Sequence, residues 1–243
     1  MDAGTWFIQL NAWQVMALGL VSFGTLYLLG GWGMSAFTRW LARHGLGRTL
    51  DTRPLKPDQL QRERRLSFNS VLVFGLGTIV PWGFLKLGWA HLSPTAGAGR
   101  IALEILALLL WNEVHFWVNH RLLHTRQLVR YHGDHHRSTV TTPWSTYSFH
   151  PVEALMLGNI ILLPMVVHDF SFWSLASVPV LSLILNTIGH SNYDFFPKVS
   201  DSHLLAASRR HHLHHARPAG NYGFSLAFMD RFMRTQVKSS DPR

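Results

Sequence analysis

The chain of 243 residues contains no cysteine. Disulfide bonds, iron–sulfur clusters, thiolate-ligated haem and cysteine nucleophiles are therefore excluded, and a bound metal would have to be held by nitrogen and oxygen atoms. The HExxH signature of one class of zinc peptidases is also absent. Acidic residues are few, 13 against 22 lysines and arginines, whereas histidine occurs 16 times. Histidine is thus the residue type most available for metal chemistry.

Eight of the histidines fall in three short clusters with the spacings HxxxH, HxxHH and HxxHH. Residues three or four apart share one face of a helix, so each cluster can direct its imidazoles at one point. A structural zinc ion needs four ligands and a catalytic one needs three, so eight indicate two metal ions. Iron, zinc and copper all suit imidazole. The clusters are His120 and His124; His132, His135 and His136; and His211, His214 and His215.

The positive charge of the chain follows its apolar pattern. The net charge is +9 and the sequence pI about 10.6, but the basic residues are not interleaved with aromatics along a polar face, so nucleic acid is not an expected partner. They lie in the gaps between apolar stretches, as the positive-inside rule predicts for a membrane protein. The mean hydropathy of +0.09 averages apolar spans with His- and Arg-rich loops.

Three apolar runs are long enough to cross a bilayer, for which about 20 helical residues are needed. They extend from about Trp13 to Met34, from Val71 to Trp89 and from Ile101 to Val118. The first run has no basic segment before it and no small-residue cleavage site after it. We therefore expect it to be a retained membrane span and not a signal peptide.

A fourth apolar stretch, from Ala154 to Gly189, is interrupted by His168 and Asp169. As one straight helix it would be about 54 Å long, against about 30 Å for the hydrocarbon core of a bilayer. It would also place the third histidine cluster across the membrane from the second. We therefore predict a helical hairpin that turns near Val167 to Phe170. Its first arm is short, about 14 residues, so it is tilted, reaches only partial depth or borrows flanking residues.

The loops predict the orientation. Eight lysines and arginines lie between Ala36 and Ser67, against two from Lys86 to Arg100, so the first loop is expected in the cytoplasm. The N-terminus is then outside, and all three clusters meet at the cytoplasmic face. The predicted fold is all-α: a single integral membrane domain over residues 1–243, with about four passes in two hairpins and a cytoplasmic helical cap that carries the histidines.

Motifs between about Glu113 and Thr235 give the chain a family resemblance. In their order they resemble those of the membrane fatty acid hydroxylase and sterol desaturase superfamily, although the tryptophan and the FGT of its WDRxFGT ending are altered. The matching segments are Glu113-Val-His-Phe-Trp-Val-Asn-His-Arg-Leu-Leu-His124, Tyr131-His-Gly-Asp-His-His-Arg-Ser138, Phe149-His-Pro-Val-Glu153, Gly189-His-Ser-Asn192, Ser208-Arg-Arg-His-His-Leu-His-His215, Asn221-Tyr-Gly223 and Met229-Asp-Arg-Phe232.

The resemblance implies a di-iron oxygenase with a catalytic region over about residues 100–237. Two iron ions would activate O2, and a C–H bond of a lipid, such as a fatty acyl chain or a sterol, would be hydroxylated or desaturated. The resemblance also implies an external electron donor, a b-type cytochrome, ferredoxin or reductase. It adds His190 to the ligands, so the implied catalytic and metal-binding residues are His120, His124, His132, His135, His136, His190, His211, His214 and His215.

Three further residues are candidate ligands. Asp194 follows His190 by four residues, so within a helix it would be a ligand or an orienting partner, and otherwise a solvated loop carboxylate. His150 and His212 could add ligands or lie on the surface. Whether any of the three binds metal stays open at this point.

Other charged residues are candidates for supporting roles, because metal-bound imidazole usually donates its second N–H to a carboxylate or carbonyl. Glu113 lies seven residues before His120 and so on the same helix face, and an acid near the end of an apolar span is costly unless paired. Asp134 and Glu153 are further candidates, with solvated loop positions as the alternative. The arginines that could attract an acidic redox partner or lipid headgroups are Arg121, Arg209 and Arg210.

Two other functions remain open from the sequence. A zinc-dependent membrane hydrolase acting on a lipid is one, although it would need fewer ligands and lacks HExxH. A metal transporter is the other, but it predicts ionisable residues along a whole path across the membrane. Lys238 to Arg243 carry no obvious retrieval signal, which favours a bacterial inner membrane over the endoplasmic reticulum.

Overall fold

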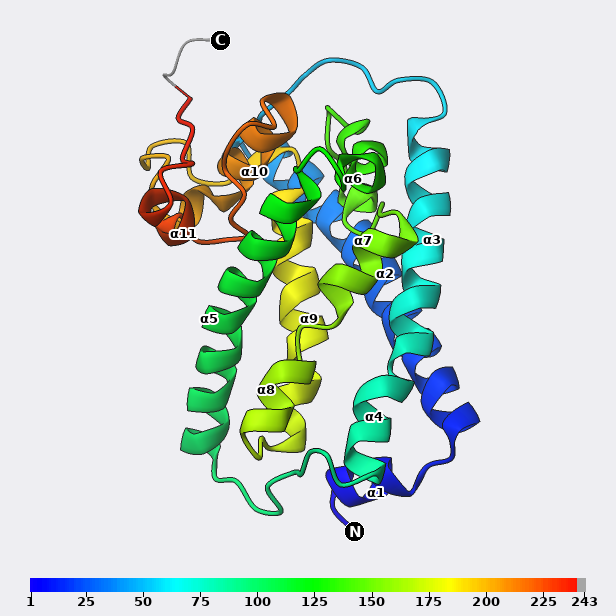
Figure 1. Ribbon diagram of the computed structural model, residues 1–243. Coiled ribbons are helices and arrows are strands. Elements are labelled where there is room, and N and C mark those ends of the chain that lie inside the picture. The colour runs from blue at the N-terminus through cyan, green and yellow to red at the C-terminus, as the bar shows by residue number, and fades with distance from the viewer. Residues whose placement is uncertain (240–243) are drawn as a thin grey trace.

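Four long apolar helices form the body of the molecule (Figure 1). The computed structural model describes residues 1–239, so 240–243 of the C-terminal segment considered above lie outside the described residues. The helices of the spanning region are α2 (Ala12–Arg43), α3 (Gln59–Gly77) continued by α4 (Ile79–Lys86), α5 (Ala98–Leu123), α7 (Pro151–Gly158), α8 (Leu162–Val167) and α9 (Phe172–Gly189).

The remaining elements are short and lie mostly around the two ends of these helices. Helix α1 lies near the N-terminus, at the end of the bundle away from α6 and α10 (Figure 1). These elements are α1 (Ala3–Gln9), α6 (Val129–His136), α10 (Ala207–Ala216), α11 (Phe228–Phe232), the 3-10 turns η1 (Pro143–Ser145) and η2 (Leu204–Ala206), and the strands β1 (Arg48–Thr49) and β2 (Tyr193–Asp194).

The predicted all-α bundle with four passes is confirmed. The first and third predicted spans lie within candidate membrane helices, whereas the second, Val71 to Trp89, extends three residues beyond its helix, which ends at Lys86. Helix α2 runs nine residues further than the predicted span, to Arg43. It ends in a Schellman motif: the N–H of Gly45, at φ +67°, donates to Ala42, and the N–H of Leu46 donates to Leu41. Several basic residues expected in the first loop therefore lie on the ends of helices, namely Arg39, Arg43, Arg62, Arg64 and Arg65.

Glycines set the distance between α2 and α3. A Cβ built on Gly19 would collide with the carbonyl oxygen of Gly75, so only glycine permits this close approach. Thr78, at the junction of α3 and α4, donates its hydroxyl to the carbonyls of Gly75 (2.6 Å) and Val15 (3.2 Å). The Thr78 hydroxyl thus binds backbone carbonyls at the point where α3 ends and α4 begins.

The predicted hairpin is confirmed. Helix α8 ends at Val167, and α9 begins at Phe172 with Ser171 as its N-cap. The first arm is broken between α7 and α8 and forms only a shorter apolar helix. Glu104 of α5 fixes the turn, because its buried carboxylate accepts from the Ser171 N–H (2.9 Å) and the Ser174 hydroxyl (2.7 Å). The chain therefore returns to the end at which it entered.

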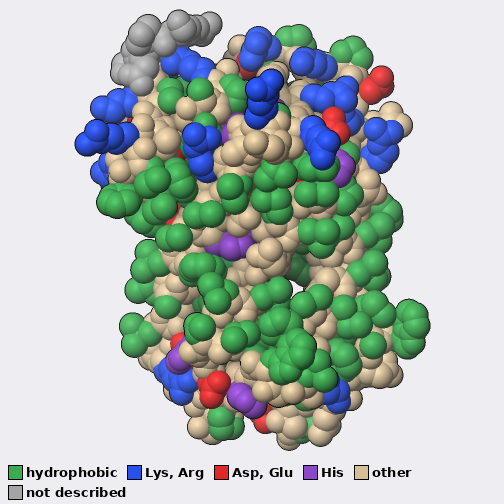
Figure 2. Space-filling view, in the orientation of Figure 1, with side chains coloured by type: hydrophobic (Ala, Val, Ile, Leu, Met, Phe, Trp, Pro, Cys, Tyr) green, Lys and Arg blue, Asp and Glu red, His purple; other side chains and the backbone are tan. Residues whose placement is uncertain are grey.

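The surface changes sharply along the bundle axis. Figure 2 shows lysines and arginines gathered at the end where α6, α10 and α11 lie, above a zone of hydrophobic side chains. Exposed residues such as Val21, Leu29 and Leu103 belong to the spanning helices. The four candidate spans bury only a minority of their side chains within the protein, as expected for helices that face lipid.

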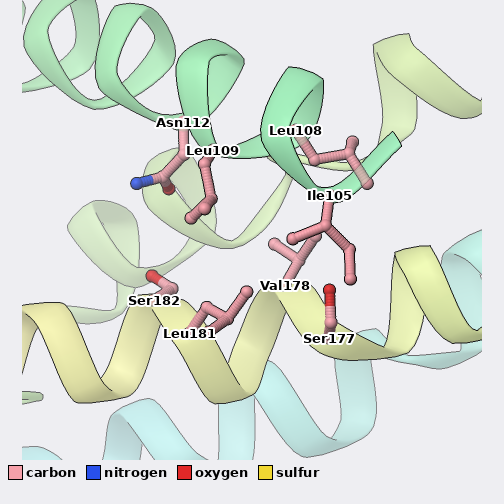
Figure 3. A pocket seen from close by; sticks show the side chains of 8 residues that line it. All are labelled: Ile105, Leu108, Leu109, Asn112, Ser177, Val178, Leu181 and Ser182. Atoms are coloured by element: carbon pink, nitrogen blue, oxygen red, sulfur yellow. The ribbon is translucent and has the colours of Figure 1, made fainter. Parts of the chain in front are cut away.

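The interior of the spanning region is closely packed between α5 and α9. A cavity of about 10 Å³ lies in this seam. Figure 3 shows the side chains that line it, among them Asn112 of α5 and Ser182 of α9. That volume suits about one water molecule. The Asn112 side-chain nitrogen is buried and has no hydrogen-bond partner among residues 1–239. A lipid chain could enter this seam only if the two helices moved apart.

Candidate metal centre

Four segments carry the candidate site: the end of α5, helix α6, the residue after α9 and helix α10. Their imidazoles converge in two groups, and within each group the ligand nitrogens lie within 4.8 Å of one another. We call them the five-histidine group and the four-histidine group. The first contains His120, His124, His132, His136 and His214, and the second contains His135, His190, His211 and His215.

Each HxxHH cluster is divided between the two groups. On α6, His132 and His136 enter the five-histidine group while His135 enters the other. Adjacent residues of a helix point about 100° apart, so the final pair of an HxxHH cluster cannot face one point. On α10 the division is reversed: His211 and His215 go to the four-histidine group and His214 goes to the five-histidine group. The repeated spacing therefore shares each helix between two sites.

In the five-histidine group the Nε2 atoms face one another. The His120 and His132 nitrogens are 3.1 Å apart, those of His132 and His136 2.9 Å, and those of His124 and His214 3.1 Å. In the four-histidine group, His190 and His211 approach to 2.9 Å. Nitrogens at these separations either share a proton or surround a cation.

Fixed acceptors decide between those possibilities for three imidazoles of the five-histidine group. The Nδ1 of His120 lies 2.9 Å from the Tyr222 carbonyl oxygen, and that of His214 lies 2.7 Å from the Gly220 carbonyl oxygen. A carbonyl can only accept, so each Nδ1 carries the proton, and the neutral ring leaves Nε2 as a bare lone pair. The Nδ1 of His132 likewise lies 2.7 Å from the carboxylate of Glu153. Convergent lone pairs repel each other unless a cation lies between them, so this donor set fits a metal ion.

The four-histidine group has a comparable contact at His190. The Nδ1 of His190 lies 2.9 Å from the Ser145 hydroxyl oxygen. That hydroxyl donates to the Thr142 carbonyl (2.7 Å), so it accepts from the imidazole. Buried Glu63 of α3 holds this segment, because its carboxylate accepts from the Thr142 hydroxyl (2.6 Å). The backbone around η1 thereby positions His190.

Burial keeps these imidazoles neutral. It lowers the pKa of His136 to about 3 and the pKa values of His124 and His211 to about 4. Arg121 lowers the pKa of His124 further, and His212 lowers that of His211. Neutral imidazole is the form that binds metal, so the site is ready for ligation at neutral pH. His124 and His136 are partly exposed, whereas every member of the four-histidine group is buried.

All nine histidines singled out from the sequence lie in these two groups. His150 and His212 join neither group in the described part of the chain. His150 caps α7 instead, accepting from the Val152 N–H through Nδ1 (3.1 Å). The structure thus separates the two open candidates from the convergent set.

Of the predicted carboxylate partners, Glu153 contacts a histidine directly. Its carboxylate lies 2.7 Å from His132 Nδ1, and both side chains are buried. Asp134, on the same helix as His132, instead forms an ion pair with exposed Arg137 (3.3 Å). For Asp134 the alternative of a solvated carboxylate is therefore the one found.

Glu113, a candidate partner of His120, contacts a different segment of the chain. Glu113 accepts from the backbone N–H groups of Ser225 (2.9 Å) and Leu226 (3.0 Å) and from the Ser225 hydroxyl. The shared helix face was correctly inferred, but a different segment of the chain lies against it. Glu113 therefore acts on the C-terminal loop and not on an imidazole.

The helical pairing of Asp194 with His190 is wrong, because α9 ends at Gly189 and Asp194 lies in β2. There β2 pairs antiparallel with β1 of the first loop. The Asp194 carboxylate accepts from both ends of the Arg209 guanidinium (3.1 Å each) and from Arg48. Asp194 thus belongs to an ion-pair network beside the site.

Two of the three arginines considered as sites for an acidic redox partner or lipid headgroups do not lie on the surface. Arg209 and Arg210 are both buried, and Arg210 donates to the carbonyls of Asp201 and His203. Arg121 is exposed and lies over the Tyr222 ring, 5.2 Å from its centre. Two of the three arginines therefore stabilise the interior of the histidine-bearing end.

The contacts of Ser145, Gly220 and Tyr222 with histidines were not predicted. The Asn221-Tyr-Gly223 motif marked part of this region, but two of the contacts use backbone carbonyls, which no side-chain pattern reveals. Ser145 lies in a segment without any metal-ligand signature. The signal for such partners exists only in the folded chain.

Comparisons with known proteins agree on the kind of protein. A family model described as fatty acid hydroxylase matches residues 105–235. The very-long-chain aldehyde decarbonylase GL1-5 of Oryza sativa subsp. indica is 28% identical over 213 residues, which cover 80% of this chain and 32% of that protein. Protein CER1-like 1 of Arabidopsis thaliana is 27% identical over 205 residues, 78% of this chain and 31% of that protein.

A third relative acts on a different lipid class by its name. The Delta(7)-sterol 5(6)-desaturase of Eremothecium gossypii is 28% identical over 174 residues, 65% of this chain and 48% of that protein. The chain thus spans about a third to a half of the length of these curated relatives. No solved structure matches the chain significantly.

Proposed function

The chain belongs to the fatty acid hydroxylase family, and from that premise we propose that it is a membrane-bound di-iron oxygenase that hydroxylates or desaturates a lipid. The observation that carries the proposal is the convergence of nine imidazoles in two groups, three of them with Nε2 fixed as a lone pair. O2 and electrons from an external donor protein are the co-reactants. The catalytic region is residues 100–237.

The two groups would each hold one iron ion. Five imidazoles would bind the first and four the second. Bound iron would supply the redox chemistry for oxygen activation and for breaking a C–H bond. The chain's own contribution is to keep the imidazoles neutral by burial and to orient them through carbonyl, carboxylate and hydroxyl acceptors.

The substrate would arrive from the membrane. Helices α5 and α9 both lead from the lipid-facing zone to ligand histidines, His120 at the end of α5 and His190 after α9. The relatives are named for long-chain aldehydes and for a sterol, so this chain's substrate is a fatty acyl, aldehyde, sterol or related lipid. The closed seam between α5 and α9 would have to open to admit it.

The histidine-bearing end would face the cytoplasm. The basic residues gather there (Figure 2), and the positive-inside rule assigns that end to the cytoplasmic side. An electron donor with an acidic surface would approach this end, where His124 and His136 are partly exposed. The five-histidine group and the four-histidine group both lie at this one end, which is the arrangement expected of an enzyme that receives electrons from one side.

The decisive experiment combines metal analysis, oxygen uptake and lipid mass spectrometry. Purified protein should contain about two iron ions per chain and consume O2 when reduced. Cells with and without the protein should differ by a lipid that has gained one oxygen or lost two hydrogens; an aldehyde-derived product shorter by its carbonyl carbon would instead indicate decarbonylation. A zinc-only protein that hydrolyses a lipid without consuming O2, or that moves metal into liposomes without lipid turnover, would overturn the proposal.

A further inference from the structure

The loop between α10 and α11 contacts the five-histidine group through its backbone. The Gly220 carbonyl accepts from His214 Nδ1 (2.7 Å), and the Tyr222 carbonyl accepts from His120 Nδ1 (2.9 Å). We call residues 220–226 the orienting loop. The orientation of two imidazoles of this group therefore depends on where this loop holds its carbonyl groups.

A buried carboxylate holds the middle of the orienting loop. Asp230 of α11 accepts from the N–H of Tyr222 (2.9 Å) and from the N–H of Gly223 (2.8 Å). Its carboxylate also accepts from the Trp117 indole N–H (3.1 Å) and the Thr235 hydroxyl (2.7 Å). Four donors thus fix this carboxylate, which is almost fully buried.

The remainder of the loop is fixed as well. Glu113 accepts from the N–H groups of Ser225 and Leu226, and Arg210 donates to the Ser225 carbonyl. At the start of the loop, Asn221 has a positive φ of 55°, and its side chain pairs with the backbone of Val237 through both its oxygen and its nitrogen. The loop therefore has little freedom to carry its carbonyls elsewhere.

One peptide plane joins the carboxylate to the imidazole. The Tyr222 carbonyl and the Gly223 N–H belong to the same peptide unit, and in a trans peptide they point in opposite directions. Asp230 binds the N–H side of this unit, and His120 binds the carbonyl side. A negative charge on the N–H side polarises the peptide and strengthens its carbonyl oxygen as an acceptor.

We propose that Asp230 is a positioning residue for the five-histidine group, acting on His120 through the Tyr222–Gly223 peptide. Glu153 orients His132 by direct contact, whereas Asp230 orients His120 through one intervening peptide unit. The carboxylate fixes the plane of the peptide, the peptide fixes the Nδ1 proton and ring orientation of His120, and Nε2 is thereby aimed at the metal position. The inference rests on the proposed function in requiring that the group binds a metal ion.

The test is Asp230→Asn in the full-length, detergent-purified protein, loaded with Co(II). The amide cannot accept from all four donors without opposing one of them with its own NH2. One of the two Co(II) ions should bind about 10–100-fold more weakly, with a changed d–d absorption, and the other should be unaffected. Asp134→Asn is the matched control, because Asp134 is also an acid near the site but pairs with exposed Arg137 and not with the orienting loop.

Each outcome decides a separate point. Wild-type and Asp230→Asn proteins with two Co(II) ions of equal affinity and spectrum would overturn the inference alone. Equal weakening of both ions together with a lower melting temperature would also overturn it, because that is the signature of a merely structural carboxylate. A wild type that takes up no Co(II) would contradict the proposed function, and the inference with it. If Asp230→Asn does not accumulate, Thr235→Val removes one donor from the same carboxylate and should weaken the same ion by a few-fold; no change would overturn the inference.

Discussion

The five-histidine group and the four-histidine group share helices α6 and α10, but their imidazoles are oriented in different ways. In the first, His120 and His214 donate to backbone carbonyls and His132 donates to a buried carboxylate. In the second, His190 donates to a serine hydroxyl. Among the described residues, the buried Nδ1 atoms of His136 in the first group and of His135 and His215 in the second have no hydrogen-bond partner.

The group with more oriented imidazoles is also the more exposed of the two. The better oriented five-histidine group includes two partly exposed imidazoles, whereas the four-histidine group is entirely buried. Charge-assisted acceptors hold an imidazole more strongly than neutral ones. If each group binds one ion as proposed, orientation would fix the first ion, while the second would depend more on burial and on its ligands alone.

The largest expected effects come from removing one ligand from each group. His135→Ala leaves three imidazoles in the four-histidine group, and His214→Ala leaves four in the other. Loss of an outer partner alone costs about 10–100-fold, so loss of a ligand should reduce activity by more than about 100-fold in both variants. Iron content should fall further for His135→Ala, which metal analysis of the purified proteins will measure.

Matched controls are His44→Ala and His91→Ala, because neither histidine belongs to either group in the described residues. Both should keep wild-type activity and iron. All four proteins should reach the membrane, since the spanning helices are unchanged. Full activity of His135→Ala and His214→Ala would remove those residues from the site, and equal iron loss would erase the difference between the groups.

An intermediate effect is expected for Glu153→Gln. The amide has the shape of the carboxylate but no charge, so it orients His132 more weakly. The affinity of the ion in the five-histidine group should fall about 10–100-fold, and that of the other ion should stay unchanged. Competition with a chelator, followed by the spectrum of the Co(II)-loaded protein, separates the two ions.

The control for this substitution is Glu104→Gln at the opposite end of the bundle. Glu104 is also a buried carboxylate with several donors, but they are Arg100 of α5 and residues of the hairpin turn and the start of α9. Glu104→Gln should lower the melting temperature and leave both affinities unchanged. If Glu153→Gln weakened both ions alike, the carboxylate would be acting on the fold and not on His132.

The sequence predicted the arrangement of the membrane helices well, because hydropathy and chemistry constrained it together. Requiring the histidine clusters to meet on one side led to the hairpin, and its turn lies at the end of α8 as expected. The close contact of Gly19 with Gly75 was beyond the sequence, because it depends on which faces of α2 and α3 pack together.

The candidate site was predicted in its membership but not in its division or support. Helix geometry separates His135 from His136, but the group that each of them joins depends on where α6 lies relative to the other histidine-bearing segments. Neither alternative considered for Asp194 is found, because the helix ends at Gly189 and the carboxylate is buried and paired with Arg209. The Tyr222 carbonyl could not be foreseen, since every residue has one.

The smallest effect in this series is expected for Ser145→Ala, which removes the acceptor of His190 Nδ1. A neutral hydrogen bond contributes about 0.5–1.5 kcal/mol, so the ion of the four-histidine group should bind about 2–10-fold more weakly while the other is unchanged. Ser177→Ala is the control, because the Ser177 hydroxyl donates only to the Ser174 carbonyl within α9. The same chelator competition measures both variants. A loss as large as that for Glu153→Gln would mean that the charge of the acceptor does not distinguish the groups, and burial alone would then have to explain their difference.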